Sequence, residues 1–567
     1  MLLNAILITF NALLYTGIGW AALGIVNRGQ TRGWFAAFWA GWAAAIGLLQ
    51  VWHFFFPVST PALVLMMAIS AAGWAIFARA GRCRDLLKGD KLALLAASAL
   101  PLAIMANHVL FSEPSYDHGL YHLQTVKWYN AHAIVRGLGN LHHRLAFNSA
   151  NLLPGALFNS GPLAGYGVYT ANSTVMAVLA ARGLQGLAAW VKAPAPQKTT
   201  HLYHALLLPA GLWQASQYPL AGYSADMVIF ALGAALGGML LGLSERAEDE
   251  RFCRGQGVLM AVLIAAGVAV KLSFAAFGAA LLASMLAIGW KHAWARKSIL
   301  TWAGLGCAWV LPWTARNIIM SGYPLYPSAL LGLPVAWRMP AHLISDISAG
   351  ITEWARTYSG QIAYTGDLSW LGTWLLRFVY EPRQAFLISM ALLAFIALAA
   401  RLKWAEKPLA GGVGLLMAAS ALSLVFWFFS APTYRFSGAA FWTLYAGAII
   451  GAYRAAHAKW GERGAAVFSI LFIIFLFYSL RNDFSKNISP GRLLAPAREE
   501  ITAEQQQPLA GMETRTTLSG LMVYVPPANS PETCWNAPLP CTTRNDYLER
   551  LSLLEPGDLG GGFLVSE

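Results

Sequence analysis

Residues 225–243 read ADMVIFALGAALGGMLLGL, an apolar run with a single acidic side chain, Asp226, at its start. An apolar stretch of about 20 residues is long enough to cross the hydrocarbon core of a bilayer as a helix. Runs of this kind recur through the 567 residues, of which 57% are hydrophobic and only 11% are charged. The sequence therefore predicts an all-α polytopic membrane protein.

The apolar runs predict about 14 transmembrane helices. They are expected at 2–25, 33–56, 60–79, 91–111, 166–191, 202–215, 225–243, 256–270, 273–290, 298–314, 384–402, 410–430, 437–453 and 464–480. Lys and Arg gather in alternate connections, at 28–32, 79–91, 192–198, 246–254, 291–297, 401–407 and 454–463. Because positively charged connections stay in the cytoplasm, both termini are expected in the periplasm of a bacterial inner membrane. This distribution explains the net charge of +13 without a nucleic-acid partner.

The chain divides into three expected parts. These are an N-terminal three-helix transmembrane segment (1–90), a transmembrane core (91–480) and a small C-terminal periplasmic unit (481–567). Within the core, two outward segments are long, 112–165 and 315–383, and loops of this length are usually functional or disordered. In residues 121–129 the apolar and aromatic side chains of Tyr121, Leu123, Val126, Trp128 and Tyr129 stand among polar ones, an amphipathic pattern that predicts a helix lying in the membrane interface. Leu521–Val525 in the last part has strand character.

Cys534 and Cys541 lie close together in the sequence CWNAPLPC of the C-terminal unit. In an oxidising compartment such a pair is expected to form a disulfide that closes a tight loop. The alternatives are two unpaired thiols or a zinc site, and the zinc site lacks a second Cys or His pair nearby.

Asp117 follows the predicted span 91–111, in the sequence SYDHGLYH of residues 115–122. His118, Tyr121 and His122 can hold a carboxylate or share its proton, so Asp117 is a candidate catalytic base. His118 and His122 are four residues apart and would share one face of a helix, where they would form an incomplete metal site with Asp117. A loop with solvated His and Asp side chains is the third interpretation.

Four more charged residues lie near expected outer helix ends. Asp226 precedes an apolar helix, where it would cap free N–H groups, act in a reaction, or do both. Lys271 interrupts the apolar run 257–290, and because a Lys at mid-membrane is costly, two short helices that meet there would bring its ammonium to the surface. Arg316 and Arg435 each follow a predicted helix. Either alone is typical of a side chain that reaches lipid headgroups, but three cations at one level can neutralise a phosphate.

Together these residues resemble the GT-C superfamily of polytopic glycosyltransferases, which take sugars from polyprenyl-phosphate donors on the outer side of the membrane. The resemblance covers roughly residues 90–480 and rests on Asp117 in a large outer loop, Asp226 before a helix and Lys271 between two spans. It continues through PWTARN (312–317), GYPLYP (322–327) and APTYRF (431–436). Three helices, rather than the single one more usual in that superfamily, precede the helix that leads into the acidic loop.

The resemblance implies an inverting glycosyltransferase that moves a sugar from a polyprenyl-phosphate donor to a glycan, lipid or protein acceptor of the cell envelope. It makes Asp117 the base that deprotonates the acceptor, with Asp226 as a second catalytic acid. The donor phosphate would be bound by Lys271, Arg316 and Arg435. Substrate-binding roles are assigned to His118, Tyr121, His122 and Tyr434. No cofactor is firmly expected, and a divalent metal that bridges the phosphate is left open.

A secondary transporter or a lipid-linked glycan flippase is the competing class, since both have many spans and a few intramembrane charges. Transporters commonly contain internal repeats and bind substrate at mid-membrane. We find no convincing repeat in this sequence, and the candidate residues lie instead at the outer boundary. A non-catalytic assembly scaffold, the third class, would need no such placement of acids and cations.

Overall fold

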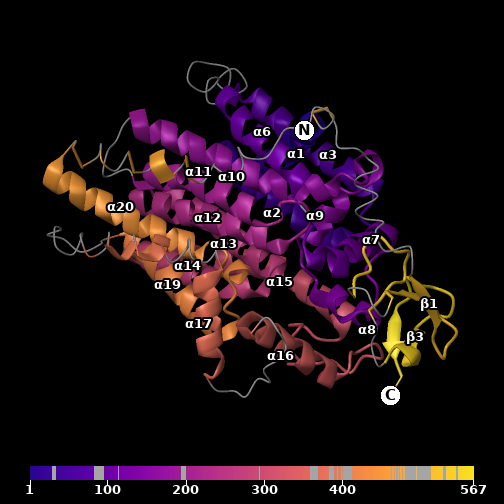
Figure 1. The fold of residues 1–567 in the computed structure, drawn as a ribbon. Helices are drawn as coiled ribbons and strands as arrows, with labels where there is room; N and C mark the ends of the chain where they lie inside the picture. Colours follow the sequence, from indigo (N-terminus) through magenta and orange to yellow (C-terminus); the bar gives the residue numbers. More distant parts are fainter. Residues whose placement is uncertain are drawn as a thin grey trace.

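The computed structural model of the protein describes residues 1–567 except 28–32, 82–94, 113, 193–198, 293, 358–367, 382–388, 393, 397, 398, 400–410, 462, 465, 466, 468, 469, 472, 476, 479–492, 495–511, 528–531, 544–546 and 567. The helices and helical turns are α1 (Leu2–Asn27), α2 (Trp34–Trp52), α3 (Thr60–Arg79), α6 (Ala99–His108), η1 (Val109–Phe111), η2 (His118–His122), α7 (Leu123–Ala131), α8 (Leu138–Leu141), η3 (His143–Phe147), α9 (Leu152–Leu157), η4 (Gly161–Leu163), α10 (Gly167–Lys192), α11 (Thr199–Gln217), α12 (Ala225–Glu245), α13 (Glu250–Val270), η5 (Leu272–Phe274), α14 (Ala275–Lys291), α15 (Trp294–Ser321), α16 (Ala341–Thr357), α17 (Trp370–Tyr380), α19 (Gly412–Ser430), η6 (Tyr434–Ser437), α20 (Ala440–Trp460) and η8 (Leu548–Arg550). The strands are β1 (Glu513–Thr516), β2 (Met522–Val525), β3 (Leu551–Leu553) and β4 (Phe563–Val565), in two antiparallel two-stranded sheets, β1 with β2 and β3 with β4. Figure 1 shows that helices make up most of the molecule.

Eight helices in the described part of the chain are long and apolar enough to cross a membrane. They are α1, α2, α3, α10, α12, α13, α14 with the turn before it, and α19. Helices α11, α15 and α20 occupy three more predicted spans, and the first two contain Pro209 and Pro312. The predicted spans 384–402 and 464–480 lie partly outside the described residues. The chain is thus a multi-pass membrane protein, while the total of about 14 spans stays a prediction.

The apolar run 257–290 is broken at Lys271, where two helices meet. Helix α13 ends at Val270, Lys271 is extended (φ −153°, ψ 118°), and the turn η5 leads into α14. The Lys271 N–H still donates to the Gly267 carbonyl over 2.9 Å. The break therefore leaves this backbone donor satisfied, as a membrane environment requires, and it places a cation at a helix end rather than in mid-helix.

The N-terminal helices α1, α2 and α3 pack with their backbones close together. A Cβ added at Gly41 would lie 1.7 Å from the carbonyl oxygen of Tyr15, so only glycine fits there. Small residues allow membrane helices to approach in this way. The Trp309 indole N–H of α15 donates to the Ala43 carbonyl over 3.2 Å, which ties the N-terminal segment to the core.

Contacts between connections divide the bundle into two ends. At one end lie the connections expected in the cytoplasm, joined by hydrogen bonds from Thr199 to Glu245, Trp294 to Ala247, Lys297 to Glu250 and Gly412 to Ser244. At the other lie helix ends expected in the periplasm, joined by hydrogen bonds from Leu220 to Ser112, Ala150 to Ala269 and Gly137 to Ile319. Which of the two ends faces the cytoplasm stays a prediction from the charge distribution.

The C-terminal unit is docked on the helical core rather than set apart from it. In Figure 1 its strands, drawn in yellow, lie beside α7 and α8. The Asn140 side chain of α8 donates to the Phe563 carbonyl over 3.1 Å, and Val525 and Phe563 are fully buried in the core shared with the helices. Cys534 and Cys541 are joined by a disulfide, with their Cα atoms 6.0 Å apart. The fold is therefore mainly, but not wholly, α-helical.

The stretch 121–129 does not lie in a membrane interface, contrary to the expectation from its sequence. Val126 and Trp128 of α7 are 0% exposed. On the polar side of this helix, the Gln124 side chain donates to the Ala537 carbonyl of the C-terminal unit over 2.9 Å. Protein covers both the apolar and the polar side of α7. The amphipathic pattern of this helix therefore results from contacts within the molecule rather than with lipid.

Candidate functional site

Asp117 directly precedes η2, a single π-helical turn of residues His118–His122. The backbone N–H of Trp535 donates to the Gly119 carbonyl over 2.8 Å, and the Trp535 ring packs against Gly119 so closely that a Cβ there would lie 2.4 Å from it. The Gln124 side chain donates to the Trp535 carbonyl over 2.9 Å. The disulfide loop of the C-terminal unit thus holds the turn that begins at Asp117.

Asp117 is paired with two arginines. Arg435 Nη1 donates to Asp117 Oδ2 over 2.8 Å, and Arg144 Nη1 lies 3.9 Å from Asp117 Oδ1. The Asp117 side chain is 17% exposed. Burial raises the pKa of Asp117, but the charge and hydrogen bond of Arg435, together with the charge of Arg144, outweigh burial and hold that pKa below its usual range. The carboxylate is therefore ionised at neutral pH.

Asp226 and Lys271 form a second ion pair between Oδ1 and Nζ, with side chains that are 16% and 22% exposed. Ser224 caps α12, because its hydroxyl accepts the Asp226 N–H over 3.3 Å. Ser224 therefore caps the helix, and the carboxylate of its near neighbour Asp226 forms the ion pair with Lys271. Burial lowers the pKa of Lys271, and Asp226 opposes that shift. The Lys271 ammonium also lies 3.9 Å from the centre of the Phe436 ring.

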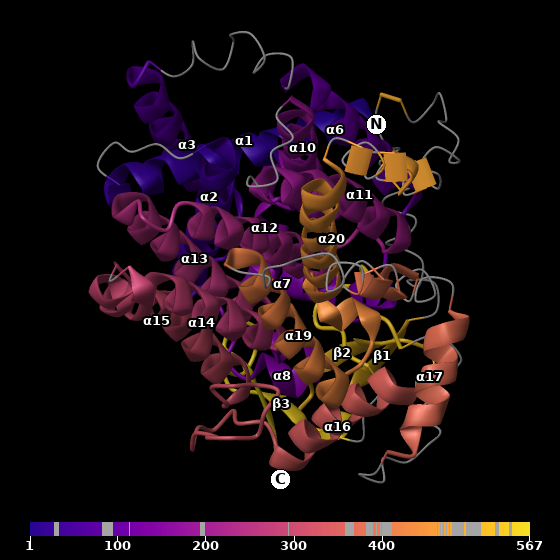
Figure 2. The same cartoon turned by 90° about the vertical axis from the view of Figure 1, so that its left-hand side faces the viewer.

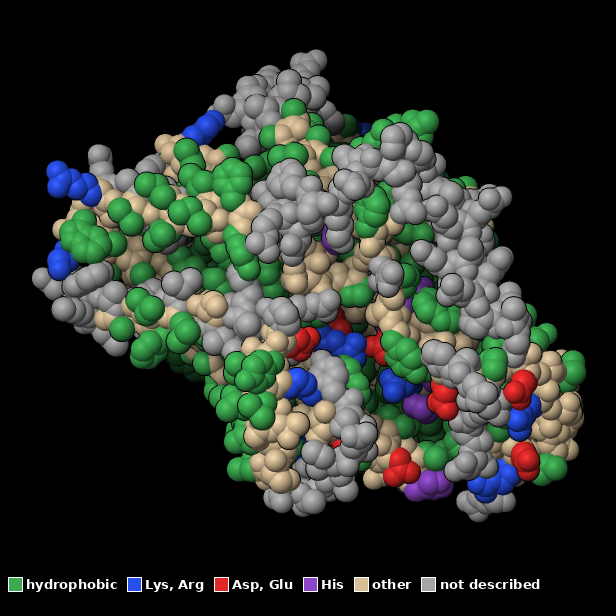
Figure 3. Space-filling view, in the orientation of Figure 1, with side chains coloured by type: hydrophobic (Ala, Val, Ile, Leu, Met, Phe, Trp, Pro, Cys, Tyr) green, Lys and Arg blue, Asp and Glu red, His purple; other side chains and the backbone are tan. Residues whose placement is uncertain are grey.

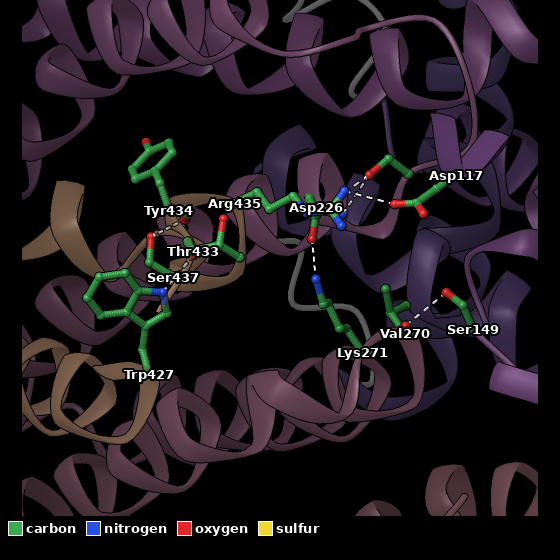
Figure 4. Close-up of polar contacts among 11 residues, drawn as sticks. Asp117, Ser149, Asp226, Val270, Lys271, Trp427, Thr433, Tyr434, Arg435 and Ser437 are labelled. Atoms are coloured by element: carbon green, nitrogen blue, oxygen red, sulfur yellow. Dashed lines mark hydrogen bonds and ion pairs between the residues drawn. The ribbon is translucent and has the colours of Figure 1, made fainter. Parts of the chain in front are cut away.

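The two ion pairs belong to one charged cluster, which we define as Asp117, Arg144, Asp226, Lys271 and Arg435. Figure 4 shows the Arg435 side chain reaching past Asp226 towards Asp117, with Lys271 on the other side of Asp226. His122 interacts electrostatically with four members of the cluster: Asp117, Asp226, Arg435 and Lys271. In Figure 3, acidic and basic side chains gather in a depression near the middle of the face shown. The sequence predictions Asp117, Asp226, Lys271 and Arg435 thus lie together.

Arg316 lies apart from the charged cluster. Its side chain is 0% exposed, its Nε donates to Asn148 Oδ1 over 2.9 Å, and its Nη1 lies 2.7 Å from Nδ1 of His53. Its guanidinium also lies 5.2 Å from the centre of the Tyr129 ring. These contacts join the residue that follows α2, the loop after η3, and α15. The Arg316 charge is directed into the protein core, where a donor phosphate would not meet it.

Tyr434 also turns away from the charged cluster, as Figure 4 shows. Its hydroxyl donates to Gln214 Oε1 and accepts the Trp442 indole N–H, both over 3.1 Å. Its ring stacks on Tyr218 with centroids 5.5 Å apart. Tyr434 therefore packs among α11, α20 and the turn η6, although its neighbour Arg435 faces Asp117.

Two of the three predicted substrate-binding residues, Tyr121 and His122, interact electrostatically with members of the charged cluster. The third, His118, lies next to His122, with the ring centres 6.4 Å apart. The His118 ring is 0% exposed, neither ring nitrogen has a hydrogen-bond partner, and it packs against Tyr223 and Trp535. Burial lowers the pKa of His118 to about 3, and burial lowers that of His122 to about 4 although Asp117 and Asp226 act in the opposite direction. Burial, followed by the charge of Asp117, raises the pKa of Tyr121. At neutral pH both imidazoles are therefore uncharged.

A divalent metal in the charged cluster stays an expectation from the sequence. Within the described ranges of the chain, no three His, Cys, Asp or Glu side chains are grouped so that they could hold an ion. Both carboxylates of the cluster are already paired with cations.

Two residues of the site have no counterpart among the sequence predictions. Arg144 lies in the middle of the long segment 112–165, away from the ends of the predicted spans, whereas the cations predicted to bind phosphate all lie near such ends. Trp354 of α16 covers Arg435, whose guanidinium lies 4.7 Å from the Trp354 ring centre and 4.9 Å from that of Phe436. Arg144 could have been proposed from the sequence, because it lies in the same long loop as Asp117. Trp354 could not, because only the packing of α16 brings it to Arg435.

Replacing His118 with phenylalanine should weaken the loss of stability in acid. The His118 imidazole stays neutral in the native state but can take up a proton once the protein unfolds. Above about pH 6.5 it is neutral in both states and does not affect the free energy of unfolding. Below that pH the free energy of unfolding falls by about 1.4 kcal/mol for each pH unit. Between pH 6.5 and 5 the wild type should lose about 2 kcal/mol through this one group. His118→Phe keeps a ring of similar shape and loses no hydrogen bond.

The measurement is the thermal melting midpoint of detergent-solubilised protein across this pH range. His342→Gln, at an exposed position of α16, is the control and should follow the wild type. Identical pH dependence in His118→Phe and the wild type would contradict the assignment.

The comparisons with known proteins add the family but no activity. Residues 1–442 match the family model described as Domain of unknown function (DUF8201), a span that contains the whole charged cluster but not the disulfide loop. No curated protein and no solved structure matches the chain. Because the match covers well over half of its length, the chain belongs to the DUF8201 family.

Proposed function

We propose that this protein is a membrane glycosyltransferase that moves a sugar from a polyprenyl-phosphate donor to a cell-envelope acceptor on the periplasmic face, with inversion at the anomeric carbon. The observation that carries the proposal is the charged cluster, in which two carboxylates meet three cations next to helix ends. The resemblance to GT-C enzymes stated from the sequence points to the same chemistry.

The charge balance of the cluster suits a phosphate leaving group. Arg144, Lys271 and Arg435 carry three positive charges against the two negative charges of Asp117 and Asp226. One positive charge is therefore left over for an anion. Charge that is already in place where a phosphate oxygen becomes more negative lowers the barrier to its departure, and Arg435 can bind two oxygens at once.

The reaction needs one base and one leaving group. The acceptor hydroxyl oxygen would attack the anomeric carbon, the bond from that carbon to the phosphate oxygen would break, and polyprenyl phosphate would leave with the electron pair. Asp117 would take the hydroxyl proton as the new bond forms. Its lowered pKa keeps it in the ionised form that a base requires. Asp226 would hold Lys271 in position beside the phosphate.

The proposed location follows from the same arrangement. The charged cluster lies at the end of the bundle opposite the connections rich in Lys and Arg, which favours a periplasmic site in a bacterial inner membrane with both termini on that side. A donor whose lipid chain stays in the bilayer would present its phosphate near that boundary.

The test is sugar transfer by the purified protein in liposomes that contain radiolabelled polyprenyl-phosphate sugars and extracted envelope lipids and glycans. We expect label to move from the donor to an acceptor, with release of polyprenyl phosphate. A parallel assay follows the transbilayer movement of a fluorescent lipid-linked sugar. Movement of that lipid without breakage of its phosphate bond would favour the flippase alternative and overturn the proposal.

A further inference from the structure

Helix α17 is apolar on nearly all sides although it is not one of the candidate spans. One face is buried, where Trp370 and Trp374 pack with Trp427 of α19. The opposite face carries exposed apolar and aromatic side chains: Leu375, Leu376, Val379 and Tyr380. Figure 3 shows hydrophobic side chains over the area that α17 occupies in Figure 1.

The single charged residue of α17 does not interrupt the exposed face. The Arg377 guanidinium donates to the carbonyls of Ala355 over 3.1 Å and Arg356 over 3.5 Å, in the last turn of α16. A cation at the C-terminal end of a helix satisfies carbonyls that lack a partner and complements the helix dipole. Arg377 therefore joins α17 to α16 and leaves the face formed by Leu375, Leu376, Val379 and Tyr380 without a charge.

Helices α16 and α17 are both fixed to the end of α19 that lies next to the charged cluster. The Trp374 indole N–H donates to the Pro432 carbonyl over 2.6 Å, and Arg356 Nη2 donates to the Phe429 carbonyl over 3.0 Å. Phe429 itself is exposed on α19, a candidate membrane span, as are Leu422, Val425 and Phe426. Figures 1 and 2 both show α16 and α17 close together in the lower part of the molecule.

We propose that α17 lies in the membrane interface, with the face formed by Leu375, Leu376, Val379 and Tyr380 inserted among lipids. A face of this kind would be costly in water. Lipid is its occupant because the face continues the exposed surface of α19, which meets lipid where that helix spans the bilayer. Amphipathic helices that bury an apolar face at the boundary of headgroups and acyl chains are a known mode of membrane contact.

The placement of α17 puts the charged cluster beside the bilayer. Phe436 packs against the cluster of Trp370, Trp374 and Trp427, and the same ring lies over Lys271 and Arg435. Trp354 of α16 covers Arg435 from its own side. Helices α16 and α17 would therefore lie between lipid and the charged cluster. This inference holds whether or not the cluster transfers sugars.

The test uses the full chain with Cys83, Cys253 and Cys307 replaced by alanine and the Cys534–Cys541 disulfide kept. One new cysteine at a time is then introduced and labelled with a fluorophore. Labels at Leu376→Cys and Tyr380→Cys report on α17, where the native side chains are 61% and 79% exposed. The protein is placed in liposomes of phosphatidylcholine, a fraction of which carries a nitroxide near the top of the acyl chain. Phe426→Cys on α19 is the lipid-facing reference. Leu518→Cys, at an 83% exposed position of the C-terminal unit, is the matched control in water.

We expect the nitroxide lipid to quench labels at 376 and 380 about as strongly as the label at 426, and at least about twofold more than the label at 518. Quenching at 376 and 380 equal to that at 518, with rapid reaction of both cysteines with a water-soluble thiol reagent, would place the face in water and overturn the proposal. Weak quenching without such reaction would show that protein covers the face and would equally overturn it. Using two surface positions keeps the test valid if one variant fails to fold.

Discussion

Asp117→Asn should reduce sugar transfer by roughly 10²–10⁴, the range typical for loss of a general base. The amide keeps the size of the carboxylate and can still accept a hydrogen bond from Arg435 Nη1, which now lies 2.8 Å away. It cannot take the acceptor proton. The measurement is the initial rate of transfer from a radiolabelled polyprenyl-phosphate sugar, with donor binding measured separately on the same preparation.

Donor binding distinguishes loss of a base from collapse of the cluster. Asp117→Asn should bind donor at least as well as the wild type, because it removes a negative charge from beside Arg144 and Arg435. Glu555→Gln is the control. It removes an exposed carboxylate of the C-terminal unit, which pairs with Arg136 of the helical core. Transfer at the wild-type rate by purified Asp117→Asn would show that the carboxylate is not the base, and would favour the transporter or scaffold alternatives.

The membrane-spanning part of the fold was predictable because its main determinant is local in sequence. A long apolar run has few alternatives to a membrane helix, and a lone Lys271 in such a run costs enough to predict the break that divides α13 from α14. The amphipathic pattern of residues 121–129 did not distinguish a lipid surface from a protein surface. It predicted a helix in the membrane interface, but α7 is covered by the C-terminal unit, which lies more than 400 positions further along the chain.

Within the site, residue type and position near a helix end identified the right candidates but not their partners. Asp117 and Arg435 are 318 residues apart, and no local pattern relates them. Arg316 and Arg435 look alike in sequence, each just beyond an apolar run, yet Arg316 is directed at His53 and Asn148 inside the core. The difference depends on which helices pack side by side, and hydropathy carries no information about that.

Lys271→Met should destabilise the protein by about 3 kcal/mol, because it leaves the Asp226 carboxylate mostly buried without its cation. This is the low end of the range for breaking a buried pair. The two side chains retain 22% and 16% exposure, and Arg435 still acts electrostatically with Asp226. The measurement is the shift in thermal melting midpoint of the purified protein in detergent, converted through a denaturation curve where unfolding is reversible.

The double variant Lys271→Met with Asp226→Asn should recover most of this loss, since removing both charges abolishes the uncompensated one. Lys297→Met is the matched control: it breaks a pair with Glu250 at 3.0 Å whose side chains are 58% and 44% exposed. An exposed pair contributes less than about 1 kcal/mol, so this variant should melt close to the wild type. Equal loss in Lys271→Met and the double variant would mean that the Lys271 stem, rather than its charge, stabilises the junction of α13 and α14. The ammonium would then be held beside Asp226 for binding an anion and not for stability.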